Sequence, residues 1–450
     1  MNSSASSAER LAVRGDILHL RADPGWGAEP GDAVEFLPDG WLLVENGRIV
    51  GVRPADQPPP TDCSIADWRG HLVLPGFIDT HVHAPQLDVI ASFGTELLDW
   101  LNTYTFPAEA AYADPQLAQA GAERFVRALL ANGVTAAVVF PTVHKVSTEA
   151  LFAAARSRGM RLIAGKVLMD RHCPDNLRDA SVASAERDSV DLIERWHGVD
   201  RLAYAITPRF APTSSEAQLA LCGELMRAYA GRAGGLYMQT HVAENRAEVK
   251  WVAELFSQAR SYLDVYARYG LLCPRSVLAH GIWLDDADRA ALAEAGGHIA
   301  CCPSSNLFLG SGLFPWGPTE RAGVSVSLAS DVGGGTSLSP LRTMADAYKV
   351  LALRGERLTA WKALYAHTLG AAQALGLAGE IGHFAAGTIA DFAVWRWAND
   401  PVQARRQELA RNLHEKLFAW LTLGDAHNLA ATYVRGQPMF ALQPIPRTAG

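Results

Sequence analysis

Eight short apolar runs, separated by helical stretches, constrain the fold of this 450-residue chain more than any other feature. The runs lack the polar alternation of half-exposed strands, which is typical of parallel strands buried on both faces. Alanine- and leucine-rich segments such as Pro115–Ala131 and Ala243–Phe256 provide helices between them. Eight β/α repeats predict a (β/α)8 TIM-type barrel. The runs are Leu72–His81, Val134–Phe140, Arg161–Met169, Arg201–Arg209, Gly235–Val242, Ser276–Trp283, His298–Cys302 and Val324–Asp331.

The two ends of the chain predict a second, smaller domain. Near the start, the strand candidates are Val13–Leu20, Trp41–Val44 and Arg48–Val52, with turn signals at Asp39-Gly40 and Asn46-Gly47. Near the end, β-like composition returns at Gly387–Trp395 and Ala431–Phe440. We therefore expect a small β-sandwich domain formed by the N- and C-terminal segments. The predicted division is 1–70 for its N-terminal part, 71–378 for the barrel, and 379–450 for its C-terminal part with a terminal helix.

Composition excludes several classes of function. The formal net charge is −7, from 40 basic and 47 acidic residues, so the chain has no electrostatic footprint for nucleic acid or an anionic membrane. No stretch reaches ~18 uninterrupted apolar residues, and the start lacks the apolar run of a signal peptide. Six cysteines are too few for a disulfide scaffold and indicate a reducing compartment. We expect a cytoplasmic protein that binds neither nucleic acid nor membrane.

Histidines and one aspartate at strand ends predict a metal site. His81 and His83 are two residues apart in a β run, so both imidazoles project to the same side. His241 ends the fifth run, His280 lies in the sixth and Asp331 ends the eighth. Barrel enzymes place their sites at these carboxyl ends of the strands. Four imidazoles and a carboxylate suit Zn²⁺, with Fe²⁺ as an alternative.

Longer motifs around these residues resemble the amidohydrolase superfamily: LPGFIDTHVH, HVAE, AHGIW and, near the end, GTIADF. The resemblance covers nearly the whole chain and is closest to the guanine deaminases. The stretches that carry it are His83–Gln86, Leu97–Glu109, Lys166–Asp175, Thr207–Ser215, His241–Asn245 and Ser305–Phe314. It implies hydrolysis of guanine to xanthine and ammonia by a zinc-bound hydroxide, in purine base catabolism or salvage, and it suggests a homodimer.

The number of metal ions depends on one lysine. Two-metal members of the superfamily bridge their ions with a carboxylated lysine from the fourth strand. Here the fourth run ends in Thr207-Pro208-Arg209 and contains no lysine. Lys166, in the third run, is predicted to be structural. We therefore expect one metal ion per chain.

The resemblance assigns proton transfer to two carboxylates. Glu244, three residues after His241, matches a proton-shuttling glutamate, although a helix N-terminus also favours a glutamate. A hydrophobic pocket would raise its pKa so that it both donates and accepts protons. Asp331 is expected to take a proton from the attacking water. His280 is expected either to ligate the metal or to hold the hydroxide.

Substrate recognition is expected from polar residues at the same rim. Arg209 offers only donors and suits the carbonyl oxygen at guanine C6, while Gln86 matches the mixed donor–acceptor edge. Phe210 is expected to stack on the purine. The plainer alternatives are an ion-paired arginine, a surface glutamine and a core phenylalanine. The predicted substrate contacts are His83, Ala84, Pro85, Gln86, Arg209, Phe210, His241, Glu244 and Asp331.

Two further features are interpreted as structural. The glycine-rich Val332–Thr336 lacks the GK[ST] of a phosphate loop and is expected to let the backbone pass close to the site. Cys301 and Cys302 are predicted to be small buried core residues.

Three alternatives stay open on the sequence alone. One is a deaminase or dechlorinase of another aminated or chlorinated heterocycle, such as a nucleoside or a triazine. The second is a two-metal cyclic amidase. The third is a non-catalytic scaffold that has lost its metal, although such relatives have degraded ligand sets and all five candidate ligands are present here.

Overall fold

The computed structural model describes residues 9–93, 97–442 and 447–448. Across these residues eight parallel strands follow one another in chain order, with the short β8 (Val167–Leu168) beside β9. Residues 1–8, which belong to the start that was predicted to lack a signal peptide, lie outside the described ranges. The eight strands are β5 (Phe77–His83), β6 (Val134–Phe140), β7 (Arg161–Ala164), β9 (Leu202–Pro208), β10 (Tyr237–Val242), β11 (Ser276–His280), β12 (His298–Cys301) and β13 (Ser325–Leu328).

The first and last strands meet and close the barrel. The Asp331 N–H donates to the His81 carbonyl, and the His83 N–H donates to the Val332 carbonyl, each at 2.9 Å. Below them, the Thr80 and Ser327 hydroxyls are 2.8 Å apart. The predicted TIM-type barrel is therefore confirmed, and its seam lies at the strand ends that carry candidate ligands.

Helices surround the barrel, and side chains cap the N-termini of several of them. Asp114 caps α3 by accepting from the Gln116 and Leu117 N–H groups, with Pro115 at the first turn. The helix predicted over Ala243–Phe256 begins later, because Asn245 forms a capping box with Glu248. The α-helices are α1 (Leu97–Trp100), α2 (Phe106–Ala111), α3 (Pro115–Leu130), α4 (Lys145–Ser157), α5 (Val182–Trp196), α6 (Glu216–Ala228), α7 (Arg246–Leu255), α8 (Tyr262–Arg268), α9 (Asp286–Ala295), α10 (Pro303–Phe308), α11 (Trp316–Arg321), α12 (Pro340–Leu353), α13 (Ala360–His367), α14 (Leu369–Ala374), α15 (Pro401–Glu408) and α16 (Leu413–Leu423). The short helical turns are η1 (Gly31–Ala33), η2 (Pro85–Val89), η3 (Leu101–Thr105), η4 (Asp175–Leu177), η5 (Ala211–Thr213) and η6 (Ala426–Asn428).

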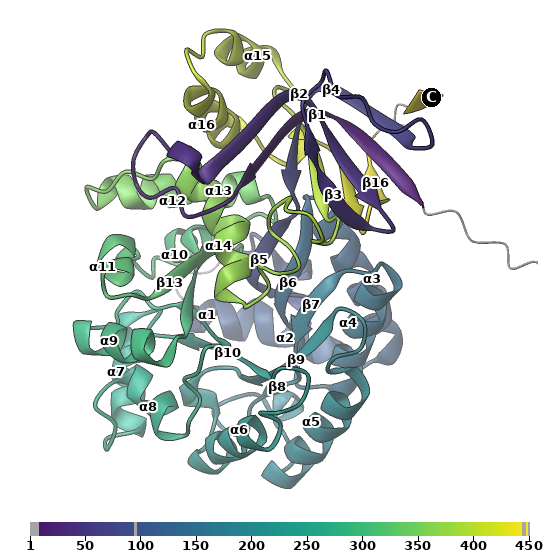
Figure 1. Cartoon of the computed structure of the whole chain (residues 1–450). Helices are drawn as coiled ribbons and strands as arrows, with labels where there is room; N and C mark the ends of the chain where they lie inside the picture. The colour runs from purple at the N-terminus through teal and green to yellow at the C-terminus, as the bar shows by residue number, and fades with distance from the viewer. Residues whose placement is uncertain (1–8, 94–96, 443–446, 449–450) are drawn as a thin grey trace, which may run out of the picture.

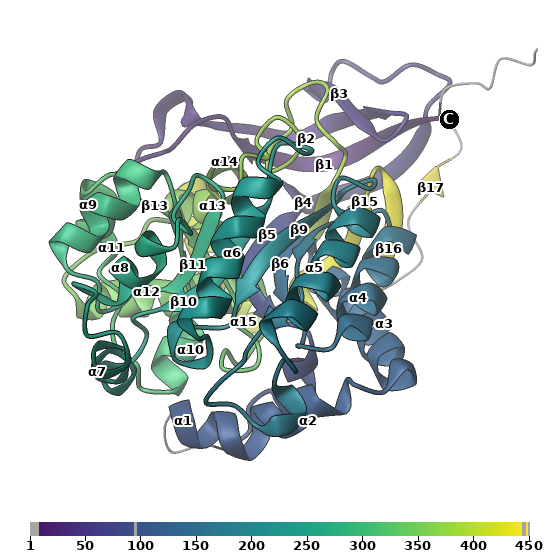
Figure 2. The same cartoon turned by 90° about the horizontal axis from the view of Figure 1, so that it is seen from below.

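Both chain ends share one sheet beside the barrel, in the order β16-β15-β14-β4-β1-β2-β3, with β17 on β4 (Figure 1). Its strands enclose an apolar core of their own, in which the Trp68 indole N–H donates to the Tyr433 hydroxyl at 3.1 Å. Figure 2 shows this sheet on one side of the barrel, with α1 and α2 on the other. The strands are β1 (Arg10–Leu20), β2 (Val34–Glu45), β3 (Arg48–Arg53), β4 (Ser64–Pro75), β14 (Phe392–Arg396), β15 (Leu429–Val434), β16 (Gln437–Ala441) and β17 (Arg447–Thr448).

Two expectations about this region need correction. The apolar run Leu72–His81 is not one strand: its first part ends β4 in the small sheet, and the rest belongs to β5. Asp39-Gly40 lies inside β2 at a register shift against β1, so it is a bulge and not a turn. Asn46-Gly47 does join β2 to β3, with φ of 52° and 75°, as a tight hairpin turn requires. The domain boundaries at 70/71 and 378/379 stay predictions.

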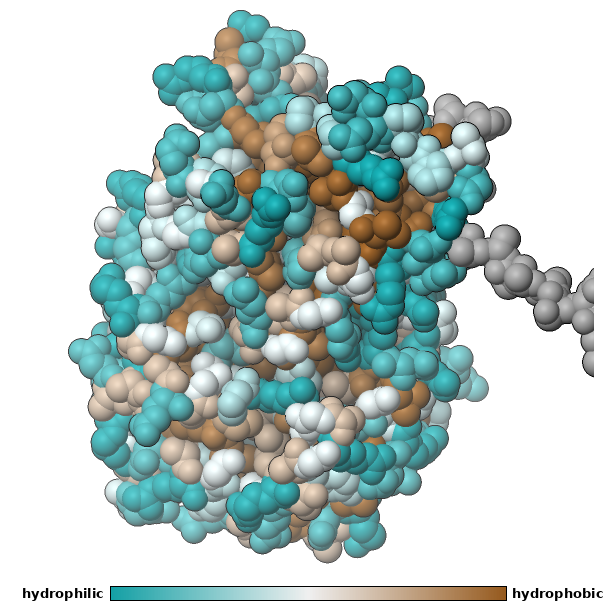
Figure 3. Space-filling view, in the orientation of Figure 1, coloured by the Kyte–Doolittle hydropathy of each residue, from teal (hydrophilic) through white to brown (hydrophobic). Residues whose placement is uncertain are grey.

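On the face shown in Figure 3, hydrophilic residues cover much of the surface, and a group of apolar residues lies in the region of the small sheet. Among the helices of the described ranges, none has the length and apolar character needed to cross a bilayer.

A buried ion pair ties the base of the barrel to the small sheet. Arg201, just before β9, contacts Asp391, just before β14, with Nη2–Oδ2 and Nη1–Oδ1 distances of 2.5 and 3.2 Å. The Arg435 N–H also donates to Asp391, at 3.0 Å. Both side chains of the pair are nearly inaccessible to water. Removing the carboxylate therefore leaves a buried, uncompensated guanidinium.

We predict that Asp391→Ala lowers the free energy of unfolding by about 3–5 kcal/mol. Denaturant titration followed by circular dichroism measures this change. The control is Glu408→Ala, because the Arg405–Glu408 pair on α15 is solvent-exposed and contributes about 1 kcal/mol or less. Equal losses in the two variants would contradict the proposed importance of the buried pair.

Candidate active site

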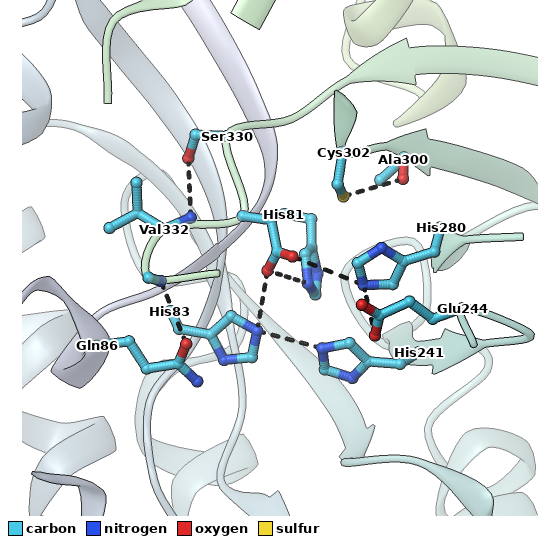
Figure 4. A network of polar contacts seen from close by, with 12 residues as sticks. His81, His83, Gln86, His241, Glu244, His280, Ala300, Cys302, Ser330 and Val332 are labelled. Carbon is cyan, nitrogen blue, oxygen red and sulfur yellow. Dashed lines mark hydrogen bonds and ion pairs between the residues drawn. The ribbon is translucent and has the colours of Figure 1, made fainter. Parts of the chain in front are cut away.

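Three histidines meet at the carboxyl end of the barrel (Figure 4). His81 and His83 project from alternate positions of β5, and His241 projects from β10. The His83 and His241 Nε2 atoms are 3.2 Å apart, and the ring centres of His81 and His241 are 4.7 Å apart. Imidazoles this close, with nitrogens directed at one another, form a donor set for a cation.

Asp331 and His280 complete the cluster predicted from the sequence. Asp331 Oδ1 lies 3.1 Å from His81 Nε2 and 3.4 Å from His83 Nε2. His280 Nε2 lies 3.6 Å from Asp331 Oδ2. His280 and Asp331 have φ of 70° and 48°, a conformation that costs about 1–3 kcal/mol in a residue other than glycine and is typical of functional sites.

The donor set fits a metal ion. Ligand atoms of His81, His83, His241 and Asp331 all lie within 4.8 Å of one another. Nδ1 of His81 and Nδ1 of His83 are buried without a hydrogen-bond partner among the described residues, and His81 Nε2 faces the Asp331 carboxylate. Unpaired buried nitrogens are costly unless a ligand binds them.

Hydrogen bonds behind the cluster orient two of its imidazoles. His241 Nδ1 donates to the Arg209 carbonyl at 2.7 Å, and His280 Nδ1 donates to Asn306 Oδ1 at 2.9 Å. These partners leave both Nε2 atoms facing the centre, an arrangement common in metal sites. Asn306 was not predicted from the sequence, although it lies in the family-like stretch Ser305–Phe314.

Burial sets the charge of the cluster. It lowers the pKa of His83 to about 3 and that of His241 well below its usual value, which keeps both imidazoles neutral. Burial also raises the pKa of Asp331, but the facing imidazoles, His81 foremost, outweigh this and hold that pKa well below its usual value. Neutral imidazoles beside an ionised carboxylate are the forms that bind a divalent cation.

Lys166 takes no part in this cluster. Its ammonium group is buried in an ion pair with Asp179, and it also donates to the Val167 carbonyl at 3.3 Å. This agrees with the structural role predicted for it.

Cys302 is buried, as predicted, but its Sγ belongs to a second close group with His81, His280 and Asp331. The prediction of a plain core residue did not include this proximity to the cluster.

A cavity opens onto the cluster. The predicted substrate contacts that line it are His83, Gln86, Arg209, Phe210, His241, Glu244 and Asp331. Ala84 and Pro85 are buried nearby but do not line it. Five further residues line the cavity and were not predicted from the sequence: Trp100, Leu101, Glu248, Leu309 and Gly334. Gly333 keeps the backbone close to the site, because a Cβ atom there would lie 2.5 Å from the Gln86 carbonyl oxygen.

Glu244 faces the cavity from the loop before α7. Its Oε1 accepts from the Ser311 hydroxyl at 2.9 Å, and its Oε2 lies 3.4 Å from His280 Nε2. Burial, reinforced by the Asp331 charge, raises the pKa of Glu244 to about 8. The Glu248 carboxylate accepts from the Glu244 and Asn245 N–H groups and so fixes this loop. The capping-box spacing of Asn245 and Glu248 was the available sequence signal for Glu248.

Arg209 is both ion-paired and cavity-lining. Its Nη1 donates to both oxygens of Glu109 in α2, at 2.9 and 2.7 Å. Gln86 Nε2 donates to the same carboxylate at 3.0 Å. Glu109 is fully buried and was not singled out from the sequence, where only its place in the stretch Leu97–Glu109 pointed to it.

Comparison with known proteins agrees with this geometry. A family model described as the amidohydrolase family matches residues 72–439. Guanine deaminase of Escherichia coli (strain K12) is 42% identical over 432 residues, covering 95% of this chain and 97% of that protein. The solved structure of E. coli guanine deaminase has a TM-score of 0.90 at 41% identity, covering 96% of this chain and 99% of that one. Guanine deaminase of C. acetobutylicum, with guanine bound in the active site, has a TM-score of 0.85 at 28% identity, covering 96% and 100%. The chain therefore belongs to the amidohydrolase family, in its guanine deaminase branch.

Proposed function

We propose that this chain hydrolyses guanine at C2 to give xanthine and ammonia. One observation carries the proposal: the imidazole–carboxylate cluster, the buried Glu244 and the pair Gln86 and Arg209 all face a single cavity. Identity of 42% with a guanine deaminase over 95% of the chain supports it.

The cluster suits one divalent metal ion. His81, His83, His241 and Asp331 would hold it, and we propose Zn²⁺, with Fe²⁺ as the alternative. His280 would either add a fifth ligand or hold the attacking water. When bound, such an ion lowers the pKa of water from 15.7 to about 7 and so provides a nucleophile at neutral pH.

Two carboxylates move the protons. Asp331 accepts a proton from the water that attacks C2. Glu244 delivers a proton to the ring nitrogen next to C2, so that negative charge does not accumulate on the ring as the new C–O bond forms. Asp331 then passes its proton to the amino group, which leaves as ammonia when the C2–N bond breaks. Glu244, ionised by the first transfer, takes the proton of the new C2 hydroxyl as the C2 carbonyl forms. Ser311 holds one Glu244 oxygen in place for this transfer.

Side chains that line the cavity recognise the purine. Arg209 donates to the C6 carbonyl oxygen, and Gln86 matches the N1–H beside it. Phe210 provides an apolar surface for the ring. A purine with an amine at C6 would face Arg209 with a donor against a donor, which such a site rejects strongly.

Guanine turnover and its metal dependence test the proposal together. Purified protein is expected to convert guanine to equal amounts of xanthine and ammonia. Removal of metal with a chelator should abolish turnover, and Zn²⁺ should restore it, because the donor set then regains its cation. Metal analysis should find about one ion per chain. Two ions per chain would favour a cyclic amidase, and metal-free protein that Zn²⁺ does not rescue would favour a scaffold.

Glu244→Gln is expected to lower kcat by about 10²–10⁴-fold, because the amide cannot donate and accept the proton in turn. Metal content should stay unchanged. Steady-state kinetics and metal analysis measure the two effects. Glu254→Gln, on the exposed part of α7, is the control and should behave as the native chain. Normal kcat in Glu244→Gln would rule out this role.

Arg209→Ala is expected to lower kcat/KM for guanine by about 10²-fold or more while metal content is retained, because the C6 oxygen loses its donor. The control is Arg187→Ala on the exposed face of α5, which should leave the kinetics intact. Unchanged kinetics in Arg209→Ala would show that this guanidinium does not read the substrate.

The alternative function is deamination or dechlorination of another heterocycle, such as a nucleoside or a triazine. A panel of these compounds, followed by ultraviolet absorbance, distinguishes it from the guanine reaction. We also propose a role in purine base catabolism or salvage, in the cytoplasm, as a homodimer. The six free cysteines support a reducing compartment, and the homodimer rests on resemblance to the family.

A further inference from the structure

Glu109 is a buried carboxylate that the proposed mechanism does not use. It belongs to α2, outside the barrel, and has no exposure to solvent. It does not line the cavity itself, but both of its side-chain partners, Gln86 and Arg209, do. A fully buried carboxylate is costly unless its charge is compensated. Glu109 accepts three hydrogen bonds from these two partners, so its role must be sought in its effect on Gln86 and Arg209.

The first consequence concerns the amide of Gln86. Its Nε2 donates to Glu109 at 3.0 Å, while its Oε1 accepts from the Gly333 N–H at 3.2 Å. A flipped amide would place its oxygen against the carboxylate and its NH₂ group against the Gly333 N–H. Glu109 therefore leaves Gln86 a single orientation.

The second consequence concerns the guanidinium of Arg209. Both contacts with Glu109 use Nη1, which fixes one edge of the planar group. Phe106, at the start of the same helix, lies against the guanidinium at 5.3 Å from Cζ to the ring centre. Two residues of α2 therefore act on Arg209: Glu109 compensates the charge of its guanidinium, and Phe106 packs against the guanidinium plane.

We propose that Glu109 is a positioning residue that makes the cavity selective for a carbonyl at purine C6. It acts through Gln86 and Arg209, which it holds in the one arrangement that presents a donor to this oxygen. The inference rests on the proposed function, because guanine supplies the C6 carbonyl.

The isosteric variant Glu109→Gln tests the proposal with two purines that share the 2-amino group. Guanine has the C6 oxygen, and 2-aminopurine lacks it. The variant should lose about 10²-fold in kcat/KM for guanine, because a displaced Arg209 no longer meets the oxygen. The value for 2-aminopurine should change little, so the ratio between the two collapses. Where a compound is not turned over, its competitive inhibition constant replaces kcat/KM.

Two further variants separate positioning from general destabilisation. Asp179→Asn breaks the buried pair with Lys166 away from the cavity, so it should lower the melting temperature and leave the ratio unchanged. Arg209→Gln should lower guanine turnover, and adding Glu109→Gln to it should cause no further loss. If Glu109→Gln fails to fold, Glu109→Asp, which keeps the charge on a shorter side chain, should shift the same ratio in the same direction.

An equal loss for both purines in the Glu109 variant, or a changed ratio in Asp179→Asn, would overturn the proposal. Additive losses in the Arg209→Gln background would also overturn it. Failure of the proposed function has a different signature, since the native chain would then bind purines without converting guanine to xanthine.

Discussion

The site depends on the seam where the last barrel strand meets the first. Two backbone hydrogen bonds of 2.9 Å join Asp331 to His81 and His83 to Val332. They set the distance between the Asp331 carboxylate and the imidazoles of β5, residues that are far apart in the chain. Barrel closure and assembly of the candidate metal site are therefore one structural event.

The cluster is unfavourable for folding by itself. His81 and His83 each have a buried Nδ1 with no hydrogen-bond partner among the described residues, and both His280 and Asp331 have left-handed backbone conformations. Such features persist only where the surrounding structure determines them, as the apolar barrel does here. Buried polar groups and strained backbone that lower the stability of the fold are typical of functional sites, so they indicate that this end of the barrel binds a ligand.

Much of this arrangement follows from sequence patterns, and the rest does not. The apolar runs predict the barrel. Because His241 and His280 are imidazoles at or near the ends of barrel strands, the sequence also predicts that they lie at the metal site. The partners Asn306 and Glu109 were not predictable in the same way. Each lies on a helix outside the barrel, and its contact depends on how that helix packs over the strand ends.

The first strand illustrates the same limit. Its apolar run is continuous in sequence, yet Pro75 ends β4 in the small sheet and Phe77 begins β5 in the barrel. The hydrophobic pattern of a segment indicates that it is buried, and the residues on both sides of Gly76 are buried. The pattern therefore does not show where the chain passes from the small sheet to the barrel.

The sequence by itself determined the barrel and the chemical character of the site, because burial patterns and donor atoms are properties of residues in order along the chain. Only the tertiary structure decided which imidazole nitrogens face the centre and which buried glutamate aligns Arg209. Those properties depend on distances between segments, and distances exist only once the helices have packed on the closed barrel.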